Sequence, residues 1–172
     1  MSKRRLQLIL IALAFLVPAL LATLLQTRWM HWDPASTRNR GELIRPVIGL
    51  VARSDAGIAD GRRWSVVVRV PAACDAGCER RLALLGRVRE AQGKEMERVR
   101  MLAWPAAGRA PQTPWTAWQP DARQQGLLAL AEAEVVLVDP LGNAMMRYRA
   151  DADPSDVRKD VAHLLRWSKV GQ

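Results

Sequence analysis

The two cysteines of the chain, Cys74 and Cys78, are the residues whose type and spacing point most directly to chemistry. They stand where a strand-like run, 62–70, gives way to a helical pattern that begins near Asp75. Unpaired backbone N–H groups and the helix dipole stabilise an anion at the start of a helix, so a thiol there has a lowered pKa. The thiolate is the form that attacks disulfides and binds soft metals. We therefore predict both cysteines as catalytic residues and as metal ligands.

The spacing of the pair leaves its chemistry open. Residues four apart on a helix share one face, with Cβ atoms about 5–6 Å apart. Two sulfurs can converge on one metal ion from there, Cu(I) by preference and zinc as a second option. They can also close into a disulfide if the first turn loosens, because that bond prefers a Cβ separation near 4 Å. A purely structural disulfide is the alternative, and its very small loop predicts only modest entropic stabilisation.

A third soft ligand would complete a copper site. Met145 and Met146 carry suitable thioethers, but neighbouring strand residues face opposite sides, so at most one can point toward the thiols. We interpret them as core residues. His163 lies within a helical pattern and is interpreted as packed or solvated rather than as a ligand.

The surrounding elements follow from hydrophobic periodicity. Continuous apolar runs predict buried strands, and apolar stripes at helical spacing predict amphipathic helices. The predicted strands are 62–70, 98–104 and 134–140, and a further strand within 43–53 is predicted at an edge because of Pro46. The predicted helices are 75–92, which ends before Gly93, then 121–133, and a last helix with Asp153 as N-cap. The segment 105–120 is predicted as a loop, and "DPLGN" as the turn of a hairpin. From residue 62 the order is β-α-β-α-β-β-α. Two parallel crossovers, a hairpin and a closing helix predict an α/β, thioredoxin-like domain.

The first 26 residues differ from the rest. Lys3, Arg4 and Arg5 precede a charge-free run from Leu6 to Leu25, which as a helix would span about 30 Å. A cleaved signal peptide would have a shorter apolar region, so we predict an uncleaved transmembrane helix. The basic flank predicts a cytoplasmic N-terminus.

The remaining boundaries follow from composition. Residues 1–26 form the cytoplasmic tip and anchor, 27–42 a polar tether, and 43–172 the folded domain on the far side of the membrane. Trp29 and Trp32 directly follow the span, where indole rings favour the headgroup layer, and His31 between them is part of the same interfacial segment.

The formal net charge of +9 does not predict a nucleic-acid partner. Residues 1–45 hold seven Lys/Arg against two Asp/Glu, and the remaining charge is spread along the chain. No basic block or basic–aromatic alternation stands out.

With these elements in place, the chain resembles the Sco-type and thioredoxin-like proteins of cytochrome oxidase assembly. It resembles in particular the small single-span proteins encoded with haem–copper oxidase assembly factors in proteobacteria. The residues that carry the resemblance are "NRGELIRP" at 39–46, "WSVVV" at 64–68, "CDAGC" at 74–78 and "LVDPLGNAMMRY" at 137–148. The cysteine spacing and the hairpin are its specific parts.

The resemblance implies a bacterial inner-membrane protein with a periplasmic domain, acting with an oxidase subunit or assembly factor. Sco-type proteins bind copper through a Cys-x-x-x-Cys pair and a histidine, and Cys74 and Cys78 match the pair. The histidine has no counterpart between 119 and 162, and Glu79 stands where proline commonly follows. The cis-proline of thioredoxins is also missing, since Glu134 leads straight into the strand.

Three functions therefore stay open. The first is an accessory factor in oxidase assembly that handles copper, as Cu(I), or exchanges thiols and disulfides. The second is a non-catalytic binding module, with Trp104, Trp115 and Trp118 as candidate anchors. We favour the interpretation that these three indoles fold back onto the core. The third is a general periplasmic thiol–disulfide oxidoreductase.

Overall fold

The computed structural model describes residues 3–26, 39–51, 57–106, 111 and 114–168. The chain divides into two compact units, Met1–Arg38 and Asn39–Gln172. The first contains one helix, α1 (Lys3–Gln26), with Pro18 inside it. Of the helices in the described ranges, none combines the length and the apolar character that a membrane crossing requires. The structure therefore does not confirm the predicted transmembrane helix, and Trp29, His31 and Trp32 lie outside the described residues.

Within its described residues, the second unit contains one mixed sheet of six strands in the order β1-β6-β5-β2-β3-β4. The strands are β1 (Glu42–Gly49), β2 (Trp64–Val70), β3 (Val99–Pro105), β4 (Trp115–Ala117), β5 (Val135–Val138) and β6 (Asn143–Tyr148). The prediction that the segment with Pro46 lies at an edge is confirmed, because β1 pairs only with β6 along this sheet. The predicted hairpin is β5–β6.

The direction of β5 differs from the prediction of two parallel crossovers. β2 and β3 are parallel, but β5 runs antiparallel to β2, with Val135 opposite Val68. The connecting helix α3 (Ala122–Leu128) has only seven residues and ends at Ala129, in the left-handed region. A helix of that length spans about 10 Å. The chain therefore enters β5 near the carboxyl end of β2 and runs back along it.

The segment 105–120 is not only a loop. Trp115–Ala117 forms the short strand β4, parallel to β3, and Trp115 is buried beneath α2 (Ala76–Glu90) with its Nε1 donating to Leu82 O at 3.3 Å. A Cβ on Gly86 would lie 3.0 Å from the Pro114 ring, so glycine at this helix position allows a close approach of the segment before β4. Trp104 is buried on the other face and Trp118 packs against the same cluster, which confirms that these indoles fold onto the core.

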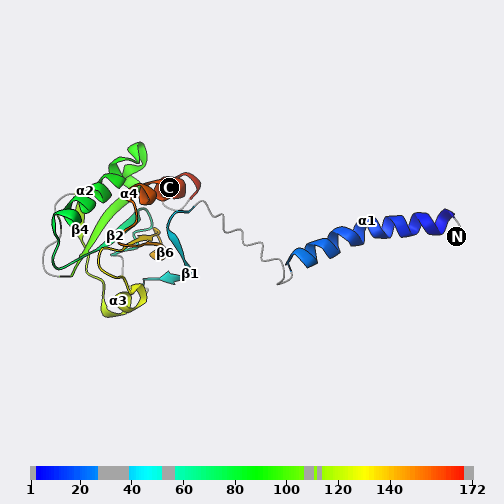
Figure 1. The fold of residues 1–172 in the computed structure, drawn as a ribbon, viewed down its shortest axis with the longest axis horizontal. Helices are drawn as coiled ribbons and strands as arrows, with labels where there is room; N and C mark the ends of the chain where they lie inside the picture. Colours follow the sequence, from blue (N-terminus) through cyan, green and yellow to red (C-terminus); the bar gives the residue numbers. More distant parts are fainter. Residues whose placement is uncertain (1–2, 27–38, 52–56, 107–110, 112–113, 169–172) are drawn as a thin grey trace. The chain divides into compact units, whose positions relative to one another are not determined.

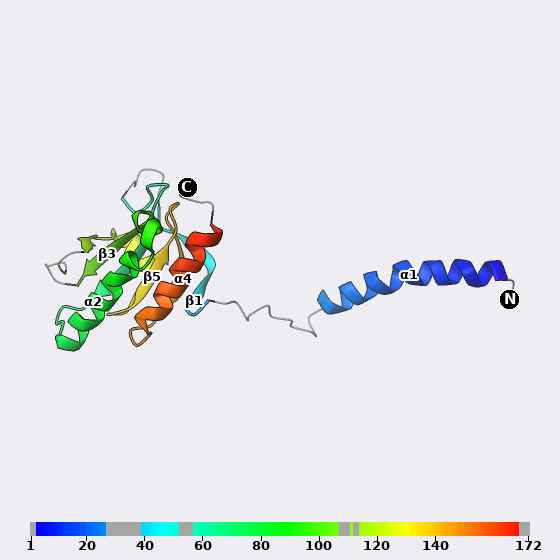
Figure 2. The same cartoon turned by 90° about the horizontal axis from the view of Figure 1, so that it is seen from above.

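Helices cover both faces of the sheet. α2 and α4 (Pro154–Trp167) lie side by side on one face, and α3 lies on the other, as Figures 1 and 2 show. β2 contributes to both cores by alternation: Val66 and Val68 point toward α2 and α4, and Val67 toward α3. This pattern explains why β2 is apolar along nearly its whole length.

Aspartates begin three of the helices. Asp75, Asp121 and Asp153 are the N-caps of α2, α3 and α4, and each side chain accepts a backbone N–H of its own first turn. The C-cap of α2 is Ala91, so the prediction that Gly93 ends this helix is off by two residues. Gly93, at φ +57°, instead opens the 3-10 helix Gly93–Arg98.

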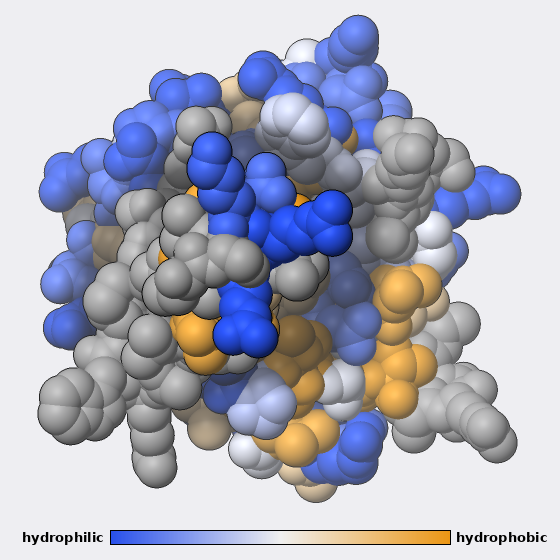
Figure 3. Space-filling model, turned by 90° about the vertical axis from the view of Figure 1, so that its right-hand side faces the viewer, coloured by the Kyte–Doolittle hydropathy of each residue, from blue (hydrophilic) through white to orange (hydrophobic). Residues whose placement is uncertain are grey.

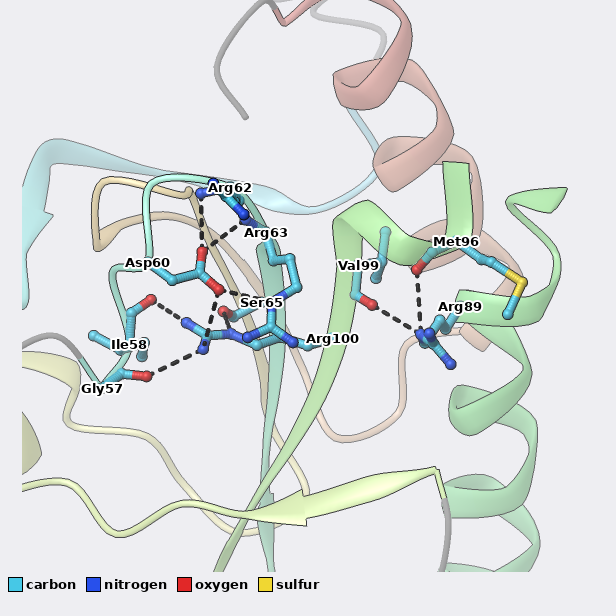
Figure 4. Close-up of polar contacts among 10 residues, drawn as sticks. All are labelled: Gly57, Ile58, Asp60, Arg62, Arg63, Ser65, Arg89, Met96, Val99 and Arg100. Carbon is cyan, nitrogen blue, oxygen red and sulfur yellow. Dashed lines mark hydrogen bonds and ion pairs between the residues drawn. The ribbon is translucent and has the colours of Figure 1, made fainter. Parts of the chain in front are cut away.

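A polar network closes the end of the sheet at which β2 and β3 begin (Figure 4). Arg100 Nε donates to Ser65 Oγ at 2.7 Å, and its terminal nitrogens donate to the carbonyl oxygens of Gly57 and Ile58. Asp60 accepts both backbone N–H groups of Arg62 and Arg63 and lies 3.7 Å from Arg100. The loop before β2 is thereby fixed to β3.

Candidate disulfide site

Cys74 and Cys78 are joined by a disulfide, with a sulfur–sulfur distance of 1.90 Å and a Cα–Cα distance of 5.3 Å. The structure thus brings together the two residues that the sequence singled out. It selects the disulfide among the pairings that the spacing left open.

The two cysteines do not share a helical face. α2 begins at Ala76, so Cys78 occupies its third position while Cys74 precedes the N-cap Asp75. Asp75 has an extended backbone, φ −79° and ψ 178°, which turns the chain before the helix starts. The predicted helix began at Asp75, one residue before the observed first residue, but the prediction that both sulfurs lie on one helical face is wrong because Cys74 lies outside the helix. Leaving Cys74 outside the helix brings the sulfurs into bonding range.

Asp75 lies between the bonded cysteines in the chain and also caps the helix. Its Oδ1 accepts the backbone N–H of Cys78 at 2.8 Å, and the N–H of Glu79 donates to its carbonyl oxygen at 2.9 Å. A Cβ on Gly77 would lie 3.3 Å from the same Oδ1, so glycine gives the carboxylate room over the first turn. The site therefore combines a neutral disulfide with a carboxylate at one helix start.

Both bonded cysteines are half-buried. Cys74 and Cys78 pack against the core cluster beneath α2 and α4. The residues around them are exposed and mostly small: Ala72, Ala73, Asp75, Ala76 and Gly77. The chain segment that carries the two cysteines is thus exposed over most of its length.

The turn between β6 and α4 lies against the first turns of α2. Arg81 donates to the carbonyl oxygens of Ala152 and Arg149. Burial lowers the pKa of Arg81, and the charges of Asp151 and Asp153 partly offset that effect. This guanidinium is therefore already engaged by the β6–α4 turn.

The family model described as the transmembrane-like, thioredoxin-like, C-terminal domain matches residues 64–168, more than half of the chain. The chain belongs to this thioredoxin-like family. No curated protein matches the sequence.

Solved structures support the fold alone. The crystal structure of the thioredoxin-like superfamily protein SPOA0173 is 17% identical with a TM-score of 0.50, over 74% of this chain and 99% of that one. Copper-bound ScoI of Bradyrhizobium japonicum is 12% identical with a TM-score of 0.43, over 62% of this chain and 86% of that one. BsSco, of the Sco family of cytochrome c oxidase assembly proteins, is 12% identical with a TM-score of 0.43, over 62% and 82%.

The loop that enters β5 has no proline, and hydrogen bonds within the chain hold its backbone. Ala133 adopts φ +63°, and its N–H donates to the carbonyl oxygen of Arg69 at 2.8 Å. The N–H of Ala131 donates to the Glu134 carboxylate at 2.9 Å. In this thioredoxin-like domain both N–H groups are therefore occupied within the chain.

Met145, Met146 and His163, the residues considered as a third metal ligand, take the positions expected of core or solvated residues. Met146 is buried and Met145 packs against the same core cluster, as expected of core residues. His163 is exposed beside Trp167 at a ring-centroid distance of 6.3 Å, which confirms that it is solvated. In the described part of the chain, no three His, Cys, Asp or Glu side chains form a group able to hold a metal. The two sulfurs fit Cu(I) in type once they are reduced.

Proposed function

We propose that the chain is a membrane-attached thiol–disulfide exchange protein of haem–copper oxidase assembly, acting through Cys74 and Cys78. The observation that carries the proposal is the half-buried disulfide at the start of α2, flanked by small exposed residues. Exchange requires that a partner thiolate reach a sulfur, and this site offers such access. A purely structural staple would gain little here, since the closed loop is very small.

The oxidase setting rests on the motifs around the pair. "CDAGC" and the hairpin segment "LVDPLGNAMMRY" resemble Sco-type sequences, and both lie in the part of the chain that folds as a thioredoxin-like domain. In this proposal the partner is an oxidase subunit whose copper-ligand cysteines have become oxidised. The reduced pair transfers two electrons to that disulfide and becomes a disulfide itself.

We place the domain outside the cytoplasm and attach it to the inner membrane through α1. Disulfides persist in oxidising compartments, which supports a periplasmic location. α1 exposes large apolar side chains, among them Leu10, Phe15 and Leu16, and these gain stability in an apolar environment. The full chain should remain with washed membranes after extraction at alkaline pH. A variant with Leu13→Arg and Leu16→Arg should be released, and release of the unsubstituted chain would refute the attachment.

Copper delivery is the second candidate, favoured by the two soft sulfur donors at one helix start. Copper would be cargo, held by Cys74 and Cys78 after reduction. Titration of the reduced full chain with Cu(I), with and without Cys→Ser at both positions, separates this function from exchange. Binding that persists in the double serine variant would remove the sulfurs from the site.

A nucleic-acid partner is not proposed. Figure 3 shows hydrophilic and hydrophobic side chains together in the view that it presents, coloured by hydropathy and not by charge. Several arginines are engaged within the domain, since Arg63 pairs with Asp60, Arg89 with Glu97 and Arg98 with Glu95. The binding-module alternative loses two of its three candidate anchors, because Trp104 and Trp115 are buried, while Trp118 is half-buried.

The direct test uses the reduced full chain in detergent and an oxidised domain carrying the two copper-ligand cysteines of an oxidase subunit. We expect reduction of that disulfide with formation of the Cys74–Cys78 bond, measured by mass spectrometry after alkylation. Either single serine variant should fail to turn over. Reduction of insulin at the same rate would favour a general oxidoreductase, and no reaction with either substrate would refute exchange.

A further inference from the structure

Asp75 is the one charged residue between the bonded cysteines, and its position bears on their redox balance. Its carboxylate is exposed, and Oδ1 lies 2.8 Å from the backbone nitrogen of Cys78. The carboxylate thus occupies the N–H group that belongs to one of the two redox residues.

A helix start without such a carboxylate favours the reduced state. Its unpaired N–H groups and dipole stabilise a thiolate, and stabilising the thiolate makes the disulfide more oxidising. Here the N–H of Cys78 is already bonded to an anion in the oxidised form. On reduction, a thiolate at either sulfur would meet a negative charge that is fixed at the same helix turn.

Charges of both signs neighbour Asp75 along α2, since Glu79 is followed by Arg80 and Arg81, so the inference rests on the direct contact of Asp75 with Cys78. Glu79, in the same first turn, is also acidic and exposed. The guanidinium of Arg81 is engaged by the carbonyl oxygens of Arg149 and Ala152. Asp151 and Asp153 of the β6–α4 turn act on that same guanidinium, and Asp151 also pairs with Arg149 at 3.4 Å.

We propose that Asp75 is a positioning residue that shifts the Cys74–Cys78 equilibrium toward the disulfide and so makes the reduced pair an electron donor. The inference rests on the proposed exchange function for its direction. In the step, the disulfide of a partner breaks and the Cys74–Cys78 bond forms. Two electrons pass to the partner, whose two sulfurs leave as thiols with the two protons. A dithiol on another protein restores the reduced pair.

The decisive substitution is Asp75→Asn, because asparagine caps a helix about as well as aspartate but carries no charge. The full chain in detergent is equilibrated with glutathione or dithiothreitol redox buffers, and the oxidised fraction is measured after alkylation. We expect the equilibrium to move toward the dithiol by about tenfold, equivalent to ~30 mV. The midpoint pH for iodoacetamide alkylation of the reduced chain should fall by about one unit. A capping role alone would move neither.

Asp121→Asn is the matched control, since Asp121 caps α3 on the opposite face by the same contact, at 2.7 Å to Gln124 N. It should leave both readouts unchanged. Asp75→Ser, a second neutral cap, guards against a folding defect of the asparagine variant and should reproduce its shift. Equilibria for both Asp75 variants within twofold of the unsubstituted chain would overturn the inference. These equilibria need no oxidase domain, so a failure of the proposed function leaves the test of Asp75 intact.

Discussion

At the end of the sheet where β2 and β3 begin, side chains close the structure, whereas the end where β2 finishes leads to the disulfide. At the first end, Arg100 binds Ser65 and the loop before β2, and Arg89 Nε donates to the carbonyl oxygens of Met96 and Val99 at 3.2 and 3.0 Å. Figure 4 shows both arginines at this end. At the second end, the chain from Pro71 to Gly77 is mostly exposed. We infer that stability and chemistry are divided between the two ends.

The division predicts the largest effect for the cysteines, and that effect is on activity. Cys78→Ser should abolish reduction of an oxidised partner, because exchange needs both sulfurs to release the mixed disulfide. Its cost in unfolding free energy should be only about 2 kcal/mol, since the loop that it opens is so short. Rates of partner reduction and urea midpoints measure the two quantities. Loss of most of the stability would instead identify the bond as a staple.

The opposite end predicts the opposite outcome. Arg100→Leu leaves Ser65 Oγ and two carbonyl oxygens without this donor and removes the cation 3.7 Å from Asp60, and we expect a loss of about 3 kcal/mol in unfolding free energy. The equilibrium of the cysteine pair in glutathione should not change. Arg63→Leu is the control, because Arg63 pairs with the same Asp60 from the surface and should cost less than 1 kcal/mol, on the order of an exposed pair. A shift of the redox equilibrium in Arg100→Leu would show that the two ends are coupled.

Asp60 should make the stability of this end of the sheet depend on pH. Burial alone would raise its pKa, but hydrogen bonds from the backbone of Arg63 and Arg62 and from the Arg63 side chain, with the charge of Arg100, lower it from 3.8 to about 2. A depressed pKa in the folded state adds stability that is complete above the ordinary value and is lost as the pH falls toward 2. Urea midpoints of the unsubstituted chain should therefore fall more steeply over this range than those of Asp60→Asn. Equal slopes would exclude Asp60 as a source of the acid dependence.

The sequence predicted the elements that carry strong periodicity and missed those that depend on partners elsewhere in the fold. The apolar runs of β2, β3 and β5 and the Asp153–Pro154 start of α4 are local signals, and each was found. β4 has three residues and exists because Trp115 pairs beside Met101, which no local pattern in a proline-rich segment reveals. α3 ends at Ala129 with φ +42°, a left-handed conformation that is not predicted for alanine from the sequence. The direction of β5 follows from this early end of the helix.

The site shows the same limit. The pairing of Cys74 with Cys78 was one of the outcomes that the spacing allowed, but the two cysteines were wrongly expected to share a helical face. Asp75 three residues before Cys78 is a standard N-cap pattern, and it was the signal that could have placed Cys74 outside the helix. What the sequence could not supply is the side-chain contact of Asp75 with Cys78, because capping by aspartate is one of several rotamers open to an exposed residue.

The smallest predicted effect separates charge from position at the disulfide end. Glu79 carries the same charge as Asp75 in the same first turn, but it is Asp75 that accepts the hydrogen bond from the backbone N–H of Cys78. Removing an exposed charge that makes no such contact should matter less, so Glu79→Gln should move the equilibrium of the pair by about twofold. The same redox buffers measure it beside Asp75→Asn. Equal shifts in both variants would mean that net negative charge at the helix start sets the balance, and that the bond from Cys78 to Asp75 contributes nothing of its own.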